Sequence, residues 1–327
     1  MKRYTSSSLR MNYFDKHRLK NGPDKLRIHF NHLCANNKNY ALMLLNSSTL
    51  SYPSLFALKD EIRNLDIFDN LNTRNKSALD ITDKIYNNNI NLIYDRENYN
   101  ILSWMFNTGY MADGMSQRYD ELLDKTAILL IKVYKDNNCL NAVEKLIYTR
   151  HRKGAFIYDL VWAFLESRSP KCIDLMLRRL LSNNKKDILL SKKLLGFIPC
   201  INPENTRKKN ALYCEAAKWV KDNYNFIYYN GDHFHQTPKP SIFRLSLENK
   251  YLQNTTHLKS VENKRSYTDF EALAIDNFRK LESESQKLLS DYSHYLYKHN
   301  RNKWSSWMGK SISEQLELAK SSKNFRI

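Results

Sequence analysis

The sequence predicts an all-α fold of stacked antiparallel helical hairpins, with a long C-terminal helix and little or no sheet. Three observations support this: an internal repeat of 33 residues, a scarcity of turn-forming residues, and apolar residues that recur at helical spacing. The 327 residues include only 7 Gly and 7 Pro. A mostly helical protein needs fewer turn residues than a β-rich or α/β protein, so the composition favours helix before any periodicity is counted.

The repeat matches Ala127–Tyr148 with Leu160–Leu181 almost position for position. Cys139 falls on Cys172, and the apolar positions on either side coincide as well. Each copy has the pattern of a helix, a short polar break and a second helix. A hairpin of this size cannot bury its apolar face alone, so we expect the copies to stack into an α-solenoid.

Two segments of the chain have the form of ankyrin-type hairpins. Ser77–Ile81 is followed by Asn87–Ile93, and Thr126–Leu130 is followed by Asn137–Ile147. Over roughly residues 70–181 the chain therefore resembles degenerate ankyrin-like repeats. It lacks the histidine of the ankyrin helix start and the glycine turn between hairpins, so stacking of the TPR or HEAT type is an open alternative.

The pattern divides the chain into four segments. Residues 1–52 form a basic N-terminal arm with one short helix near Lys25–Leu33, and residues 53–223 form the helical-repeat domain. A third hairpin, over Lys185–Phe197 and Ala211–Asn223, ends the repeats. Residues 224–266 form an irregular connector, drawn at most as a short strand pair or an extended strap, and residues 267–327 form the C-terminal region.

The C-terminal region has the clearest local signals. Thr268 and Glu271 have the spacing of a capping box, and apolar residues then recur every three or four positions without Gly or Pro. This predicts one helix of about 34 residues. A second capping box, at Ser311 and Glu314, predicts a short helix that ends at Ala319.

Positive charge is concentrated in two parts of the chain. Residues 1–40 hold nine Lys/Arg against two Asp/Glu, and residues 145–221 hold seventeen against six. These two segments account for the whole formal excess of +18. Loops at equivalent places in stacked repeats lie along one edge, so we expect the second segment to form a basic stripe.

The stripe supplies the candidate binding residues. It would attract phosphates and so bind nucleic acid in a salt-dependent way, or it would dock an acidic protein face, or it has no specific role. The residues expected on it are Arg150, Arg152, Lys153, Arg178, Arg179, Lys185, Lys186, Arg207, Lys208 and Lys209.

Signs of catalysis or of a cofactor are missing from the sequence. It contains no Gly-rich phosphate loop, no GxSxG and no HExxH motif, so we expect no catalytic residues and no cofactor. Asp232, His233 and His235 form one cluster that could suggest a metal, but zinc needs three or four ligands and no nearby Cys or His completes the set. We expect no metal site.

These features predict a non-enzymatic scaffold or adaptor, a component of a larger assembly. Nucleic-acid or ribonucleoprotein binding is the alternative, and an enzyme without a recognisable motif is the second alternative. Trp304 and Trp307 lie between two predicted helices, either as an anchor for the last helix or as partner-binding residues. The five cysteines and the absence of a long apolar run favour a cytoplasmic protein without a membrane span, with the mitochondrial matrix or a viral origin left open.

Overall fold

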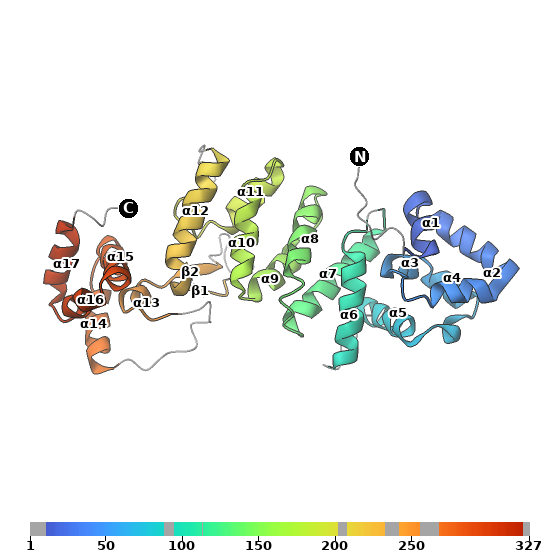
Figure 1. Cartoon of the computed structure of the whole chain (residues 1–327), viewed down its shortest axis with the longest axis horizontal. Helices are drawn as coiled ribbons and strands as arrows, with labels where there is room; N and C mark the ends of the chain where they lie inside the picture. The colour runs from blue at the N-terminus through green and yellow to red at the C-terminus, as the bar shows by residue number, and fades with distance from the viewer. Residues whose placement is uncertain are drawn as a thin grey trace. The chain divides into compact units, whose positions relative to one another are not determined.

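The computed structural model describes residues 11–87, 95–112, 114–201, 208–232, 242–255 and 268–322 (Figure 1). The chain divides into two compact units, Met1–Ser167 and Arg168–Ile327. The predicted all-α class is confirmed, because the described residues form seventeen α-helices and one two-stranded sheet. The boundary between the units falls inside the second copy of the sequence repeat.

The described part of the first unit is entirely helical. Within it α6 packs against α3, α5 and α7, and α7 packs against α9. In chain order the helices are α1 (Tyr13–Asn21), α2 (Pro23–Leu45), α3 (Tyr52–Ala57), α4 (Lys59–Asn64), the 3-10 helix η2 (Phe68–Asn70), α5 (Thr73–Tyr86), α6 (Arg96–Gly109), α7 (Gln117–Lys132), α8 (Leu140–Arg152) and α9 (Tyr158–Glu166).

The N-terminal segment differs from the expected arm with one short helix over Lys25–Leu33. Residues from 13 to 45 form α1 and α2, which pack against each other. Phe14 and Phe30 are both fully buried and meet edge to face, with ring centroids 5.6 Å apart. Helix α2 is kinked at Asn37, where the side-chain oxygen accepts from the Tyr40 amide and restarts the helix. The few apolar residues of this basic segment are thus enough to anchor it.

The repeated segment forms helices separated by short breaks, as its sequence predicts. Helices α7 and α8 form the first copy, and α9 is the first helix of the second copy. Helices α7 and α9, which occupy equivalent places in the two copies, pack against each other. The equivalent Cys139 and Cys172 are both buried. The stacking of the whole array into a solenoid stays a prediction.

The second unit combines the last repeat helices with the C-terminal region. Helix α10 packs against α11 and α12, and the C-terminal helices gather around α15. In chain order the elements are α10 (Pro170–Arg179), α11 (Lys185–Leu194), α12 (Lys209–Asn223), the 3-10 helix η3 (Tyr224–Phe226), β1 (Ile227–Tyr229), β2 (Phe243–Leu245), α13 (Leu247–Tyr251), α14 (Asp269–Arg279), α15 (Ser283–His299), α16 (Arg301–Met308) and α17 (Ile312–Ser321).

The connector after α12 contains the short strand pair that the sequence suggests. Strands β1 and β2 are antiparallel, and Tyr228 lies opposite Arg244. Ile227 and Phe243 have no exposed surface, so this small sheet is anchored by burial of its apolar side chains.

The prediction of a single long C-terminal helix is wrong. The segment forms two helices, α14 and α15, separated at Lys280–Glu282. The capping box of Thr268 and Glu271 is present as predicted. At the break, the side-chain amide of Gln286 donates to the carbonyl oxygens of Phe278 and Leu281, at 3.3 and 3.0 Å. These bonds satisfy carbonyls that an uninterrupted helix would pair internally, so the turn costs few hydrogen bonds. The apolar period continues across it, which is why the sequence reads as one helix.

The C-terminal helices enclose a core rich in aromatic residues. Tyr251 stacks on Phe278 with ring centroids 4.7 Å apart, and the edge of Trp307 meets Tyr251 at 6.0 Å. The short helix with the capping box at Ser311 and Glu314 is confirmed as α17. Trp304 and Trp307, which the sequence places between two predicted helices, lie in a further helix, α16.

Side-chain burial in α10 gives a test of the repeat core. Ile173 is fully buried, whereas the neighbouring Leu175, also apolar in the repeat, is only half-buried. Ile173→Ala should lower the free energy of unfolding by about 2–4 kcal/mol, because it leaves a cavity, and Leu175→Ala by less than about 1 kcal/mol. Urea denaturation of both variants measures the difference. Equal losses would contradict the placement of α10.

Candidate functional site

The candidate site is a groove lined by residues of α10 and α12. These two helices pack against each other in the second unit, where Figure 1 labels them. The amino group of Lys209, at the start of α12, donates to the carbonyl oxygens of Leu181 and Ser182, just beyond the end of α10. The start of one helix therefore lies beside the end of the other, and the two helices run antiparallel.

The groove has a volume of about 490 Å³ and is partly open to solvent. Its lining residues recur at three or four positions on each helix, as expected for one helical face. They are Pro170, Asp174, Leu177 and Arg178 from α10, Tyr213, Ala217, Val220 and Lys221 from α12, and Tyr224 from η3. Buried Leu177 and Val220 make the floor apolar, and the polar groups stand at its sides.

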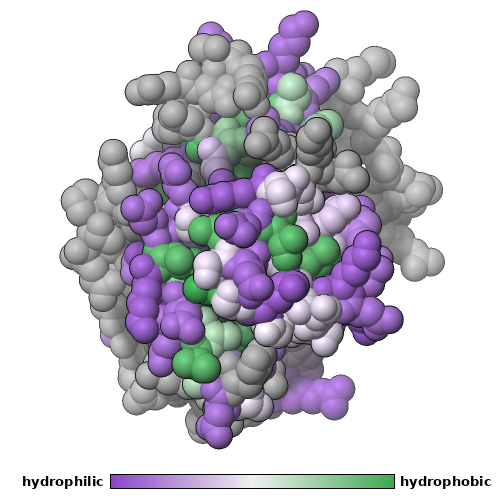
Figure 2. Space-filling view, turned by 90° about the vertical axis from the view of Figure 1, so that its left-hand side faces the viewer, coloured by the Kyte–Doolittle hydropathy of each residue, from purple (hydrophilic) through white to green (hydrophobic). Residues whose placement is uncertain are grey.

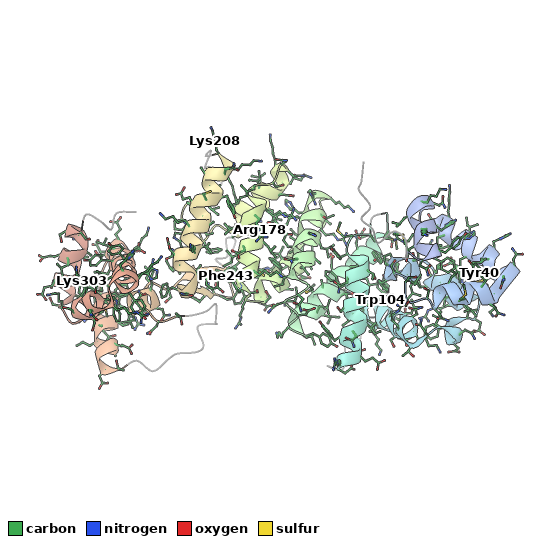
Figure 3. The ribbon with its side chains drawn as sticks, viewed as in Figure 1. Tyr40, Trp104, Arg178, Lys208, Phe243 and Lys303 are labelled. Atoms are coloured by element: carbon green, nitrogen blue, oxygen red, sulfur yellow. The ribbon has the colours of Figure 1, made fainter. Side chains whose placement is uncertain are left out.

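The polar groups give the groove a positive balance. Arg178 and Lys221 are exposed at its edge, against the single carboxylate of Asp174 (Figure 3 labels Arg178). Burial, and then the negative charge of Asp174, raise the pKa of the Tyr224 hydroxyl. This hydroxyl therefore stays protonated at neutral pH and can donate a hydrogen bond. The groove offers two cations, phenol groups and an apolar floor.

Arg150, expected on the basic stripe, is a buried structural residue. Only 4% of its side chain is exposed. Its guanidinium lies 2.7 Å from a carboxylate oxygen of Asp120 and 3.3 Å from one of Asp124, both on α7. Arg150 therefore joins α8 to α7. It is part of the first unit's core, and its prediction as a phosphate contact is wrong.

Two further cations of the expected stripe bind within their own unit. Arg179 lies 3.5 Å from Asp187, a carboxylate that is 1% exposed. The amino group of Lys209 donates to the side-chain oxygen of Asn183 at 2.9 Å, besides the two carbonyls at the end of α10. Both residues stabilise the turn between α10 and α11. Asp187 offsets the charge of Arg179, whereas the partners of Lys209 are neutral oxygens and its charge stays exposed.

The remaining candidates are exposed and fall into one group in each unit. Arg152 and Lys153 end α8 in the first unit. In the second unit Lys185 and Lys186 begin α11 and Lys208 precedes α12, with Arg178 on α10. Figure 3 shows Lys208 at the N-terminal end of α12. Because Lys209 reaches residues 181–183, these second-unit cations gather near the α10–α11 turn. Arg207 lies outside the described residues, and a stripe through both units stays a prediction.

The two tryptophans belong to the C-terminal core. Trp307 is 3% exposed and donates from its indole nitrogen to the Gln315 carbonyl at 3.3 Å, so it is not accessible to a partner. Trp304 is half-buried and donates to the Ser293 hydroxyl at 2.8 Å. Figure 2 views the molecule from the side of the C-terminal helices. On its described surface, apolar residues stand in small groups between hydrophilic ones, the ordinary pattern of a protein surface.

The groove residues of α12, and Tyr224 directly after it, were not identified from sequence. Tyr213, Ala217, Lys221 and Tyr224 recur every three or four positions, the spacing of one helix face, while the buried face of α12 uses Leu212, Ala216 and Val220. In the sequence these residues form a second periodic set beside the buried apolar set of α12. The second set is hard to recognise, because it mixes tyrosine, alanine and lysine and so has no apolar periodicity.

The described residues were also compared with the requirements of a metal site and of a membrane-spanning helix. These residues contain no group of three or more His, Cys, Asp or Glu that could hold a metal ion. His233 and His235 of the candidate metal cluster lie outside them. In the described parts of the chain, no helix combines the length and the apolar character needed to cross a membrane. Comparison with protein-family models, curated proteins and solved structures found no match to this chain.

Removal of the Arg150 side chain tests its structural role. Arg150→Ala should lower the free energy of unfolding by about 3 kcal/mol, because it leaves the partly buried carboxylates of Asp120 and Asp124 without their cation. Exposed Arg152, at the end of the same helix, is the matched control, and Arg152→Ala should cost less than about 0.5 kcal/mol. Thermal denaturation compares the two. A small effect at Arg150 would contradict its assignment to the core.

The same cluster predicts a pH dependence of stability. Burial raises the pKa of Asp124 to about 6, partly opposed by Arg150. The folded chain then takes up a proton that the unfolded chain does not bind until lower pH. From about pH 7 to about pH 5 the wild type should gain roughly 1 kcal/mol of stability relative to Asp124→Asn. Urea titrations at both pH values measure this, and a constant difference would refute the raised pKa.

Proposed function

We propose that this chain is a non-enzymatic adaptor that binds another protein, and that the groove between α10 and α12 receives a segment of that partner. The observation that carries the proposal is the composition of the groove. Its apolar floor is flanked by Tyr213, Tyr224 and Arg178, and tyrosine and arginine are the residue types that most often dominate the energy of protein interfaces.

The charges favour an acidic segment with apolar anchors. Arg178 and Lys221 exceed the single acid, Asp174, and the exposed cations near the α10–α11 turn extend the positive field beyond the groove. Such a field speeds the approach of an acidic partner and weakens with added salt. The apolar floor at Leu177 and Val220 would hold the anchors, because it removes their surface from water.

The groove is built on rigid elements, which suits a binding role. The buried faces of α10 and α12 hold it from below, and the hydrogen bonds of Lys209 fix the start of α12 against the end of α10. A preformed groove costs little ordering entropy when a partner binds. Apart from Asp174, each polar lining residue has a use in this role, either as a cation or as a hydroxyl donor.

The proposal predicts that blocking the groove weakens binding. A displayed library of random peptides, selected on the immobilised full chain, should yield peptides that combine Asp or Glu with large apolar residues. Ala217→Trp places a bulky ring in the groove and should weaken these peptides at least about tenfold, because their apolar anchors lose their site. Fluorescence anisotropy of the selected peptides measures the affinity.

Ala211→Trp is the matched control for that experiment. Ala211 lies on the same helix, is exposed and does not line the groove. This variant should bind the selected peptides like the wild type. Failure to enrich any acidic and apolar sequence, or equal binding by Ala217→Trp, would contradict the adaptor proposal for this groove.

A further inference from the structure

The loop between α8 and α9 exposes an aromatic ring on a stacked support. Phe156 has 78% of its surface exposed, the largest fraction among the exposed large apolar residues of the described chain. Its ring stacks on Tyr158, with centroids 6.0 Å apart and planes 29° apart. Tyr158 in turn meets Trp162 edge-on at 6.0 Å, and Trp162 is 2% exposed. A ladder of three rings therefore runs from the core of the first unit to solvent.

The backbone before the ladder is fixed by a helix cap. Gly154 follows α8 with φ of +75°, a conformation that other residues rarely adopt. Its amide donates to the His151 carbonyl at 3.1 Å, and the Ala155 amide donates to the Arg150 carbonyl at 3.0 Å. These two bonds form a Schellman motif. Because α9 begins at Tyr158, Phe156 is held between two helix ends and needs little ordering to present its ring.

A purely structural role does not account for the exposure of Phe156. This residue precedes the N-cap residue of α9, where an apolar side chain commonly packs on the fourth residue of the helix, here Val161. With most of its surface in water, Phe156 makes little of this contact, and Val161 is already buried by other neighbours. The stack on Tyr158 leaves the outer face of the Phe156 ring available.

Two cationic residues precede Phe156 closely in the chain. Arg152 and Lys153 end α8, both are exposed, and the Schellman motif turns the chain immediately after them. Arg152 donates to the Thr149 hydroxyl at 3.1 Å and remains exposed. The acid in this stretch is Asp159, in the first turn of α9, where a negative charge suits the helix dipole.

We propose that this loop is a binding site for single-stranded nucleic acid, in which one base stacks on Phe156 and Arg152 and Lys153 hold the adjoining phosphates. An exposed aromatic face beside cations is the arrangement by which proteins bind single strands without reading their sequence, because every base has a π-face. In a duplex the bases are already stacked on each other and do not offer that face. The site is in the first unit and is independent of the α10–α12 groove.

The proposal is tested with a short fluorescein-labelled oligouridine and the full chain, at low salt. Phe156→Leu keeps an apolar side chain but removes the ring, and it should weaken binding on the order of tenfold. Phe156→Trp keeps a stacking face and should bind at least as well as the wild type. Replacing Arg152 and Lys153 by Gln should reduce the salt dependence of log K by roughly one per lost phosphate contact.

Two controls distinguish stacking on Phe156 from binding at any exposed apolar side chain or in the groove. Ile28 is exposed to a similar degree, at 70%, without a stacked ring, and Ile28→Ala should bind like the wild type. Ala217→Trp, which blocks the groove, should also leave the oligonucleotide affinity unchanged. Equal binding by Phe156→Leu, or duplex RNA bound as well as the single strand, would overturn the stacking site. Direct binding of fluorescein-labelled poly-glutamate, with no binding of oligouridine, would overturn the proposal and assign the loop to an acidic protein instead.

Discussion

The structure depends on one constraint: each short amphipathic helix must cover its apolar face with a neighbour. Helix α10 has only ten residues, and its buried residues Cys172, Ile173, Met176 and Leu177 lie on one side. Isolated helices of this length are marginal in water, so packing provides most of their stability. The opposite side of α10, with Asp174 and Arg178, then becomes one wall of the groove. The same packing that stabilises the helix thus creates the candidate surface.

The basic residues divide into structural and exposed groups by the same logic. Arg150 and Arg179 face carboxylates of neighbouring helices, and Lys209 makes three hydrogen bonds to the turn that follows α10. The two arginine contacts require a cation, and the lysine contacts a hydrogen-bond donor, whatever the protein binds. The charges that stay exposed to a partner are those at helix ends, such as Lys153 and Lys208, where the chain leaves the packed helices.

Helix ends also decide where this protein presents its exposed chemistry. The Schellman motif at Gly154 ends α8 and sets Phe156 in solvent, and the amide of Gln286 closes the turn between α14 and α15. In both places the chain satisfies carbonyl groups that a helix end leaves unpaired. The groove and the aromatic loop are different surfaces with different chemistry. The groove, in the second unit, has an apolar floor between tyrosines and cations, and the loop, in the first unit, has a single exposed ring beside cations.

The sequence by itself determined the helical class, the places of the helices from α7 to α12, and the caps of α14 and α17. These are local properties, because the period of apolar residues and the capping residues act within one turn or two. Only the tertiary structure decided that Arg150 is buried, that Trp307 lies in a core, and that one apolar period spans two helices. Each of those outcomes depends on groups far apart in the chain: Asp120 for Arg150, Tyr251 for Trp307, and the fold-back of α15 on α13 for the break. A periodic pattern indicates which face of a helix is apolar, but packing in three dimensions determines which neighbouring element covers that face.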